Sequence, residues 1–364
     1  MKIVHFLYEL VSGGAERFVV DLANAQVEAG HDVTVCMLRP FDDRTGFNRQ
    51  FLASGVHFVP LNVASGISIG KLKIVSDFLS LANPDVLHCH HNILPYLALW
   101  LPCRKNTVVV HTVHSAADRA YKNVGERIYT WFLYKLGLVH PVAISSECRK
   151  SFKSVYGIEA ACINNGRASS ALTGAFEQVK KEIDGYRSST DTKVFIHVGR
   201  CHPVKNQDLL VDSFNALERE GVDFTLLVIG AAFDSELGRA LREKSCKRIH
   251  YLGEKNNVAD YLMNSDAFCL SSFSEGLSIS LIEALQCGVT PICTPVGGNP
   301  DVVIDGKTGY MSADLSMEAY LKALHRYLAD PLDRVSLQEF FNDNFSMTSC
   351  CTKYVELYRS LMKQ

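Results

Sequence analysis

The amino-acid sequence predicts an α/β protein with two doubly wound domains, each built around a parallel sheet. Three observations support this fold class. Short apolar runs rich in β-branched residues recur along the chain with helical stretches between them, which is the pattern of parallel strands buried under crossover helices. Both halves of the chain open with a strand, a tight loop and a helix. With 364 residues, the chain also exceeds the size at which a single hydrophobic core keeps growing.

The expected strands follow from the apolar runs, because a strand covered on both faces needs apolar residues at consecutive positions. In the first half the runs are 2–7, 32–38, 57–60, 86–89, 107–112, 142–145 and 161–163. In the second half they are 193–198, 224–229, 249–252, 267–270 and 289–294. We therefore expect two sheets, each with a ligand-binding edge at the carboxyl ends of its strands.

The domain boundaries follow from the two openings and from a polar stretch between them. We expect an N-terminal domain at 1–166, a linker at 167–192 and a C-terminal domain at 193–345, with a deep crevice between the domains. The tail at 346–364 has apolar residues on one side only. It is therefore expected to form a helix that packs back on the N-terminal domain.

Composition narrows the class of function. The formal net charge is -2 and no block of like charges occurs, so the chain lacks the basic field that holds nucleic acid. Its 12 cysteines are scattered without a Cys-x-x-Cys pair, which favours buried thiols in a reducing compartment. The first residues do not follow the pattern of a signal peptide, and no apolar stretch reaches the ~18 residues of a membrane span. We therefore expect a cytoplasmic protein.

The first candidate ligand loop is Gly13-Gly14-Ala15-Glu16, where the first strand passes into the first helix. Exposed amide groups and the positive end of the helix dipole can bind an anionic group at such a place. A tight turn that merely needs glycine explains the same residues. The dinucleotide fingerprint Gly-x-Gly-x-x-Gly is absent, so this loop alone leaves both interpretations open.

Charged residues follow two strands of the second half. Arg200 and Lys205 lie in the loop and helix start after the strand at 193–198, a position that favours a phosphate clamp over a surface salt bridge. Glu275 follows a later strand, and Glu283 lies in the largely apolar helix after it. Carboxylates bind sugar and ribose hydroxyls well because they accept two hydrogen bonds at once.

Taken in order, these motifs resemble the retaining glycosyltransferases of family 4, which have the GT-B architecture of two facing Rossmann-like domains. The matching features are Gly13-Gly14-Ala15-Glu16, Gly199-Arg200 with Lys205-Asn206, Glu275 with Glu283, and Gly297-Gly298 with Asp305-Gly306-Lys307-Thr308-Gly309. Each feature is weak alone, but the ordered set is specific. The resemblance covers nearly the whole chain and is densest at residues 195–311.

The resemblance implies a donor site in the second half of the chain. Arg200 and Lys205 would hold the donor diphosphate, and Glu283 would hold the ribose. Glu275 would bind the transferred sugar together with the backbone that follows it, at Gly276, Leu277 and Ser278.

Residues of the first half would complete the site. By the resemblance, Gly13 and Gly14 would approach the phosphates. His114 matches the histidine that these enzymes place over the donor sugar, although a structural histidine is the alternative, and His111 is expected to point into the sheet. The expected catalytic residues are therefore His114, Arg200, Lys205 and Glu275.

The resemblance also implies the reaction. A hexose-type sugar would move from a nucleotide diphosphate sugar, expected to be a UDP-sugar, to a glycan or lipid-linked acceptor with retention of anomeric configuration. Two preorganised cations and helix N-termini can stabilise the leaving diphosphate, and the sequence has no Asp-x-Asp motif, so we expect neither a metal nor a cofactor. One departure is Asn165-Gly166-Arg167-Ala168, where the family often has Asn-Gly-apolar-Asp, and it weakens any role for the linker.

Two other functions remain open from the sequence. A sugar-nucleotide epimerase of the same architecture would also bind a nucleotide diphosphate, although the spacing of Glu275 and Glu283 argues against it. A carbohydrate-binding protein without activity would have to keep Arg200, Lys205 and Glu283 by accident. The aromatic helix at 126–138 could touch the inner face of a membrane, but a core helix has the same pattern.

Overall fold

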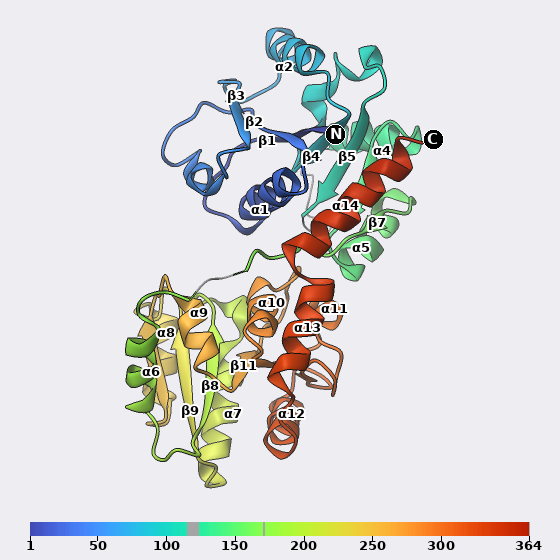
Figure 1. Cartoon of the computed structure of the whole chain (residues 1–364). Helices are drawn as coiled ribbons and strands as arrows, with labels where there is room; N and C mark the ends of the chain where they lie inside the picture. Colours follow the sequence, from blue (N-terminus) through green and yellow to red (C-terminus); the bar gives the residue numbers. More distant parts are fainter. Residues whose placement is uncertain (115–123, 170–171, 364) are drawn as a thin grey trace. The chain divides into compact units, whose positions relative to one another are not determined.

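The chain folds as two compact units in the computed structural model, which describes residues 1–114, 124–169 and 172–363 (Figure 1). The first unit contains Met1–Ala168 together with Asn344–Gln364, and the second contains Ser169–Asp343. Residues 170 and 171 of the expected linker and residue 364 of the expected C-terminal helix lie outside the described part of the chain. None of the described helices is both long enough and apolar enough to cross a membrane.

The first unit is built on a parallel sheet of seven strands in the order β3-β2-β1-β4-β5-β6-β7. Its strands are β1 (Lys2–Leu7), β2 (Asp32–Met37), β3 (His57–Pro60), β4 (Val86–His90), β5 (Val108–Val113), β6 (His140–Ala143) and β7 (Ala161–Cys162). The strand order reverses direction at β1 and β4, so the loops after these strands diverge and leave room for a ligand. The apolar runs of the sequence correctly locate these strands, with ends that differ because ladder partners decide where a strand stops.

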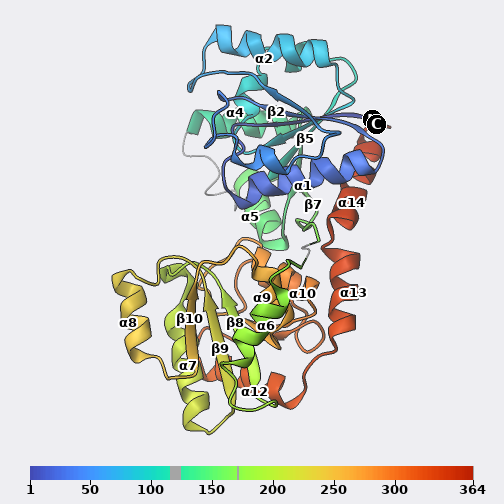
Figure 2. The same ribbon diagram turned by 60° about the vertical axis from the view of Figure 1, so that its left-hand side comes forward.

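Helices cover both faces of the first sheet. α1 (Gly14–Glu28) and α14 (Met347–Leu361) pack over one face, and α2 (Ile69–Ala82) lies on the other (Figure 2). The core beneath α1 and α14 includes Ile3, Val86 and Val110, one residue from each of the three central strands. The other helical segments are η1 (Phe47–Phe51), η2 (Leu94–Leu97), η3 (Leu101–Cys103), α4 (Val124–Lys135) and α5 (Ser146–Tyr156).

The terminal helix α14 belongs to the first unit although it follows the second in sequence. Ser346 caps it by accepting a hydrogen bond from the Ser349 amide. The Met347 amide donates to the Arg167 carbonyl at 3.0 Å. Tyr354 and Tyr358 are fully buried against the sheet. The one-sided apolar pattern of the tail is therefore used for packing inside this unit.

The second unit has a parallel sheet of six strands in the order β10-β9-β8-β11-β12-β13. Its strands are β8 (Lys193–Val198), β9 (Phe224–Ile229), β10 (Ile249–Gly253), β11 (Ala267–Leu270), β12 (Thr290–Cys293) and β13 (Tyr310–Met311). Its helices are η4 (Pro203–Lys205), α7 (Gln207–Arg219), α8 (Glu236–Lys244), α9 (Val258–Met263), α10 (Ile279–Gln286), α11 (Asn299–Val302), α12 (Met317–Ala329) and α13 (Arg334–Asn344). Strand β13 was not predicted from the sequence, because two residues are too short to show a period.

Most of the expected linker lies within the second unit. It contains α6 (Phe176–Asp184), which buries Val179 and Ile183. The Tyr261 hydroxyl donates to Glu182 at 2.8 Å, and the Thr173 amide donates to Asp260 at 2.9 Å. The short helix is therefore a packed part of the second unit, because its apolar side needs a surface.

Candidate functional site

The predicted cation and carboxylate lie at the carboxyl ends of two neighbouring strands in the second unit. β8 and β11 pair directly. Lys205 ends the short η4 that follows β8, and Glu275 lies in the loop after β11. Lys205 Nζ is 2.8 Å from Glu275 Oε1, and the side chains are 25% and 10% exposed. The fold thus brings together two charges that are 70 residues apart in the chain.

Hydroxyl groups hold the two loops in place around this pair. The Ser271 hydroxyl donates to the carbonyls of Lys205 and Asn206 at 3.1 and 2.9 Å. The Ser272 hydroxyl donates to Glu275 Oε1 at 2.5 Å. Lys205 and Ser272 therefore bind the same carboxylate oxygen. Within the described residues, these contacts leave Glu275 Oε2 available to accept a hydrogen bond from a ligand.

The Gly297-Gly298 motif supports the loop of Glu275 through close backbone contact. A Cβ atom on Gly297 would clash with the Glu275 carbonyl, and its φ of +58° also favours glycine. A Cβ atom on Gly298 would clash with the carbonyl of Gly276, which accepts a hydrogen bond from the Gly298 amide at 2.7 Å. These glycines are needed to keep Glu275 in position.

The other predicted donor residues lie in the same loops or in the helix that follows, and they differ in exposure. Arg200 is exposed, and its carbonyl accepts a hydrogen bond from Gln207 at 2.9 Å. Gly276 is exposed, whereas Leu277 and Ser278 are buried just before α10. Glu283 lies within α10 and is half-buried. Arg200 and the 276–278 backbone thus follow β8 and β11 at the carboxyl edge of the sheet, and Glu283 lies one turn into the helix after them.

A buried histidine beneath this site escaped the sequence analysis. His197 lies in β8, and its Nδ1 is 2.9 Å from the Cys269 carbonyl. Burial lowers the pKa of His197 to about 4, which keeps the ring neutral. Its position inside an apolar strand run was the available signal, since a histidine in such a run must be buried.

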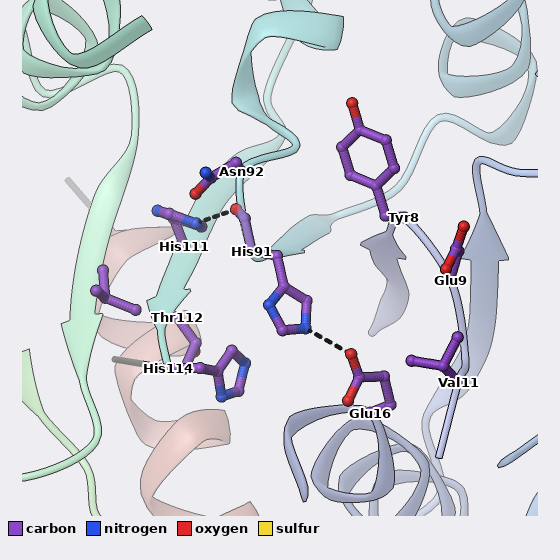
Figure 3. Close-up of a pocket in the computed structure, with 10 residues that line it drawn as sticks. Tyr8, Glu9, Val11, Glu16, His91, Asn92, His111, Thr112 and His114 are labelled. Carbon is purple, nitrogen blue, oxygen red and sulfur yellow. Dashed lines mark hydrogen bonds and ion pairs between the residues drawn. The ribbon is translucent and has the colours of Figure 1, made fainter. Parts of the chain in front are cut away.

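A separate pocket of about 340 Å³ lies at the carboxyl edge of the first sheet (Figure 3). Its lining comes from the loops after β1 and β4, from the end of β5 and the residue after it, and from the start of α1. The lining residues are Tyr8, Glu9, Val11, Glu16, His91, Asn92, His111, Thr112, Val113 and His114. Polar side chains from three strand ends therefore converge where the strand order reverses.

His114 reaches this pocket directly after β5. Its Nε2 is 3.1 Å from His90 Nδ1, and among the described residues no group partners its buried Nδ1. Burial, together with the charges of His91 and His111, lowers the pKa of His114 well below the ordinary value. His114 is therefore a neutral ring. His111 is buried, with its Nε2 at 2.7 Å from the His91 carbonyl, and it also lines this pocket (Figure 3).

The glycine loop borders the same pocket. Gly13 precedes α1, and Gly14 is the first residue of that helix. A Cβ atom on Gly13 would overlap the Glu16 carboxylate, which lies 3.3 Å from His91 Nε2 (Figure 3). No described atom lies within 4 Å of a Cβ atom built on Gly14. The Glu16 carboxylate is the end of a flexible side chain and can move, so packing strictly requires glycine at neither Gly13 nor Gly14.

Three further histidines lie behind His114, and the sequence analysis did not use them. His5 of β1 and His88 and His90 of β4 are fully buried. They share a sheet face with the apolar Ile3 and Val86, because side chains alternate along a strand. Burial lowers the pKa of His5 to about 4, and burial is also the first cause of the low pKa values of His88 and His90. The spacing of His88 and His90 by two residues, and the place of His5 inside an apolar strand run, were the signals that could have revealed them.

Two family models match the chain, one in each half. The model described as Glycosyltransferase Family 4 matches residues 12–167, and the model described as Glycosyl transferases group 1 matches residues 178–342. Both predicted ligand loops lie inside these matches.

Curated relatives agree with this assignment. N-acetyl-alpha-D-glucosaminyl L-malate synthase of Bacillus anthracis is 32% identical over 193 residues, which are 50% of this chain and 49% of that protein. The match thus spans about half the length of that relative. Phosphatidyl-myo-inositol mannosyltransferase of Mycolicibacterium smegmatis is 24% identical over 312 residues, with 82% of this chain and 77% of that protein covered.

Solved structures share the fold over the whole chain. A glycosyltransferase from Rickettsia africae has a TM-score of 0.83 at 18% identity and covers 100% of this chain and 98% of its own. The Anabaena protein HepE in complex with UDP has a TM-score of 0.79 at 17% identity. The match covers 99% of this chain and 100% of HepE. With one matching family model in each half and this common architecture, the chain belongs to glycosyltransferase family 4 and has the GT-B fold.

Proposed function

We propose that the protein is a retaining glycosyltransferase that moves a hexose-type sugar from a UDP-sugar to a glycan or lipid-linked acceptor. The observation that carries this proposal is the Lys205–Glu275 pair at the carboxyl ends of β8 and β11. A cation suited to phosphate and a carboxylate suited to sugar hydroxyls lie side by side there. A nucleotide diphosphate sugar needs both kinds of partner.

Each predicted site residue of the second unit has a distinct role in the proposed reaction. Lys205 and Arg200 bind the diphosphate, and Glu283 accepts hydrogen bonds from the ribose. Glu275 Oε1 is already bound by Lys205 and Ser272, so Oε2 accepts a hydroxyl of the transferred sugar. The backbone amides of Gly276, which is an exposed residue, and of the residues after it complete the sugar site.

The proposed chemistry separates the sugar from a leaving diphosphate. As that bond breaks, negative charge grows on the diphosphate, and Lys205 and Arg200 stabilise it without reorganising. The acceptor attacks the face from which the diphosphate leaves, and a donor phosphate oxygen takes the proton of its hydroxyl, so the anomeric configuration is retained. Because two side-chain cations can neutralise the negative charge of the leaving diphosphate, we propose transfer without a metal.

The relatives support the classes of donor and acceptor. HepE was solved with UDP, and the named product or acceptor of two relatives is a malate glycoside and a phosphatidylinositol lipid. These names favour UDP as the nucleotide and leave room for a lipid acceptor. We propose no nucleic-acid partner.

A lipid acceptor requires contact with a membrane, and α4 has a suitable surface. Val124, Ile128 and Phe132 recur every fourth residue of α4 and are 67%, 52% and 51% exposed. The cations Arg127 and Lys135 are exposed on the same helix. An apolar stripe flanked by cations can bind the interface of an anionic bilayer, so we propose this face of α4 as a peripheral membrane contact.

The membrane contact is testable with vesicles that contain anionic lipid. We expect Ile128→Ser combined with Phe132→Ser to reduce co-sedimentation with these vesicles. Ile74→Ser combined with Leu81→Ser is the matched control, because these residues are exposed on α2. Equal losses in both double variants would contradict a specific role for α4.

The proposed reaction is tested by nucleotide release. The protein is incubated with a panel of UDP-, GDP- and ADP-sugars, with and without glycan and lipid-linked acceptors, in excess EDTA. We expect UDP to accumulate only when an acceptor is present, and the product to keep the anomeric configuration of the donor by NMR. Conversion of the nucleotide sugar without an acceptor would indicate an epimerase instead. Loss of transfer in EDTA with recovery in magnesium would reject the metal-free mechanism.

A further inference from the structure

A continuous line of hydrogen bonds runs from the buried face of α1 to the pocket of the first unit. Gln26 Oε1 of α1 is 2.7 Å from His5 Nε2. His5 Nδ1 is 3.0 Å from His90 Nε2, and His90 Nδ1 is 3.1 Å from His114 Nε2. We call Gln26, His5, His90 and His114 the histidine chain. It ends at His114 Nδ1, the buried atom that no described residue partners.

The amide of Gln26 decides which nitrogen of each ring carries the proton. A neutral imidazole has one donor nitrogen and one acceptor nitrogen. Because Gln26 Oε1 can only accept, His5 must donate from Nε2, and its Nδ1 must accept from His90 Nε2. His90 Nδ1 then accepts from His114 Nε2. The same order leaves Nδ1 of His114 without a proton.

A second line of contacts orients the amide of Gln26. Gln26 Nε2 donates to the Tyr358 hydroxyl at 3.5 Å, and this hydroxyl is 2.7 Å from His88 Nδ1. His88 Nε2 is 2.7 Å from Thr112 Oγ1, which is 2.9 Å from the Tyr354 hydroxyl. With Tyr358 donating to His88, its hydroxyl oxygen accepts from the Gln26 NH₂ group. Reversing the amide would reverse each bond of the histidine chain.

We propose that Gln26 and Tyr358 are positioning residues that hold His114 as the neutral Nε2–H tautomer, so that its Nδ1 accepts a hydrogen bond from a sugar hydroxyl of the substrate. This inference rests on the proposed function for the identity of the ligand. The assignment of the tautomer rests on these contacts together with the orientation of the Gln26 amide, in which Oε1 faces His5 and Nε2 faces Tyr358. Neither Gln26 nor Tyr358 lines the pocket.

The electrostatics of the cluster agree with a neutral acceptor. Burial is the first cause that lowers the pKa values of His5, His90 and His114. A neutral acceptor nitrogen favours an O–H group over an anionic oxygen, which would meet its lone pair. The pocket beside His114 therefore suits a sugar hydroxyl better than a phosphate or carboxylate.

A metal ion is the alternative occupant of this cluster, because ligand atoms of His5, His88 and His90 lie within 4.8 Å of one another. Both nitrogens of each ring, however, already have a hydrogen-bond partner. A metal would have to replace these bonds. Because every ring nitrogen of these three histidines already has a hydrogen-bond partner, the hydrogen-bonded cluster is favoured over a bound metal ion.

The tautomer is tested by ¹⁵N NMR of histidine-labelled protein, with His114→Ala used to assign the signal. We expect the His114 Nδ1 signal at the position of an unprotonated ring nitrogen and the Nε2 signal at that of a protonated one. Gln26→Met removes the fixed acceptor and should shift both signals toward an average of the tautomers. A protonated Nδ1 in the parent protein, or one bound zinc per chain by elemental analysis, would overturn the proposal.

Tyrosine variants separate this role from a packing role. Tyr358→Phe removes the hydroxyl that orients Gln26, whereas Tyr354→Phe removes the same atom one turn away on α14, at the far end of the second line. Both side chains are fully buried. We expect Tyr358→Phe to change the His114 signals and Tyr354→Phe to leave them unchanged. Equal changes in the two variants would mean that packing, not hydrogen bonding, sets the tautomer.

Steady-state kinetics test whether the histidine chain affects catalysis. Gln26→Met should lower kcat more than it raises KM, and it should cause no further loss in a His114→Ala background, because it acts through that ring. Additive losses would overturn the positioning role. If no nucleotide sugar is transferred at all, the proposed function fails, while the NMR experiment still decides the tautomer.

Discussion

At the scale of single residues, Lys205 and Glu275 are expected to affect different parts of the donor. Lys205→Met should weaken binding of free UDP about 10–100-fold, because a charge-assisted hydrogen bond contributes about 1.5–3 kcal/mol. Glu275→Gln should weaken binding of the intact sugar nucleotide and leave UDP binding unchanged. Isothermal titration of both variants with both ligands measures this difference.

Lys244→Met is the matched control for this prediction. Lys244 also forms ion pairs in the second unit, with Asp208 at 2.7 Å and Asp212 at 3.0 Å. These pairs lie between surface helices, so their loss should leave the binding of UDP unchanged. An equal loss of UDP affinity in Lys205→Met and Glu275→Gln would contradict the division between phosphate and sugar.

At the scale of elements, the first turn of α1 shows whether a glycine is required by packing or by a bound ligand. Gly14 and Gly70 are the first residue of α1 and the second residue of α2, and no described atom lies within 4 Å of a Cβ atom built on either. Changing either residue to alanine should leave the unfolding free energy unchanged or raise it by about 0.4–1 kcal/mol.

Activity should distinguish the two glycines. If a donor phosphate approaches the amide of Gly14, Gly14→Ala lowers kcat/KM, whereas Gly70→Ala leaves it unchanged. Steady-state kinetics and urea unfolding of both variants provide the measurement. A Gly14→Ala variant with the parent rate would show that the glycine serves the turn alone.

At the scale of the whole molecule, the buried histidines should make the first unit sensitive to acid. His5 and His111 have pKa values lowered to about 4, whereas an unfolded histidine titrates near 6.5. Between these values the unfolded chain binds protons that the folded unit does not. Stability is therefore complete above about pH 6.5 and falls by up to about 1.4 kcal/mol per pH unit for each such histidine, down to about pH 4.

Tryptophan fluorescence can follow this effect, because both tryptophans, Trp100 and Trp131, belong to the first unit. Urea unfolding between pH 7.5 and 4.5 gives the slope of unfolding free energy against pH. His111→Gln should reduce this slope. His57→Gln, at a side chain that is 72% exposed, should leave it unchanged, and the same slope in all three proteins would reject the assignment.

The sequence by itself determined the two sheets and the loops that carry Lys205 and Glu275. Parallel strands buried on both faces require consecutive apolar residues, so the strands and their order along the chain can be found from local composition. Glycine, arginine, lysine and glutamate at the ends of these strands then indicated the ligand edge. This information is local, because each motif spans a few residues.

Only the tertiary structure decided which of these residues meet. Lys205 and Glu275 touch because β8 and β11 are neighbours in the sheet, and the period of a strand does not encode its neighbours. His5 and His90 are 85 residues apart, and Gln26 and Tyr358 are 332 residues apart. The first of these two contacts forms because β1 and β4 are neighbours in the sheet, and the second forms because α14 packs in the first unit. The proton positions of a histidine cluster depend on all of its partners at once, and those partners come together only in the folded chain.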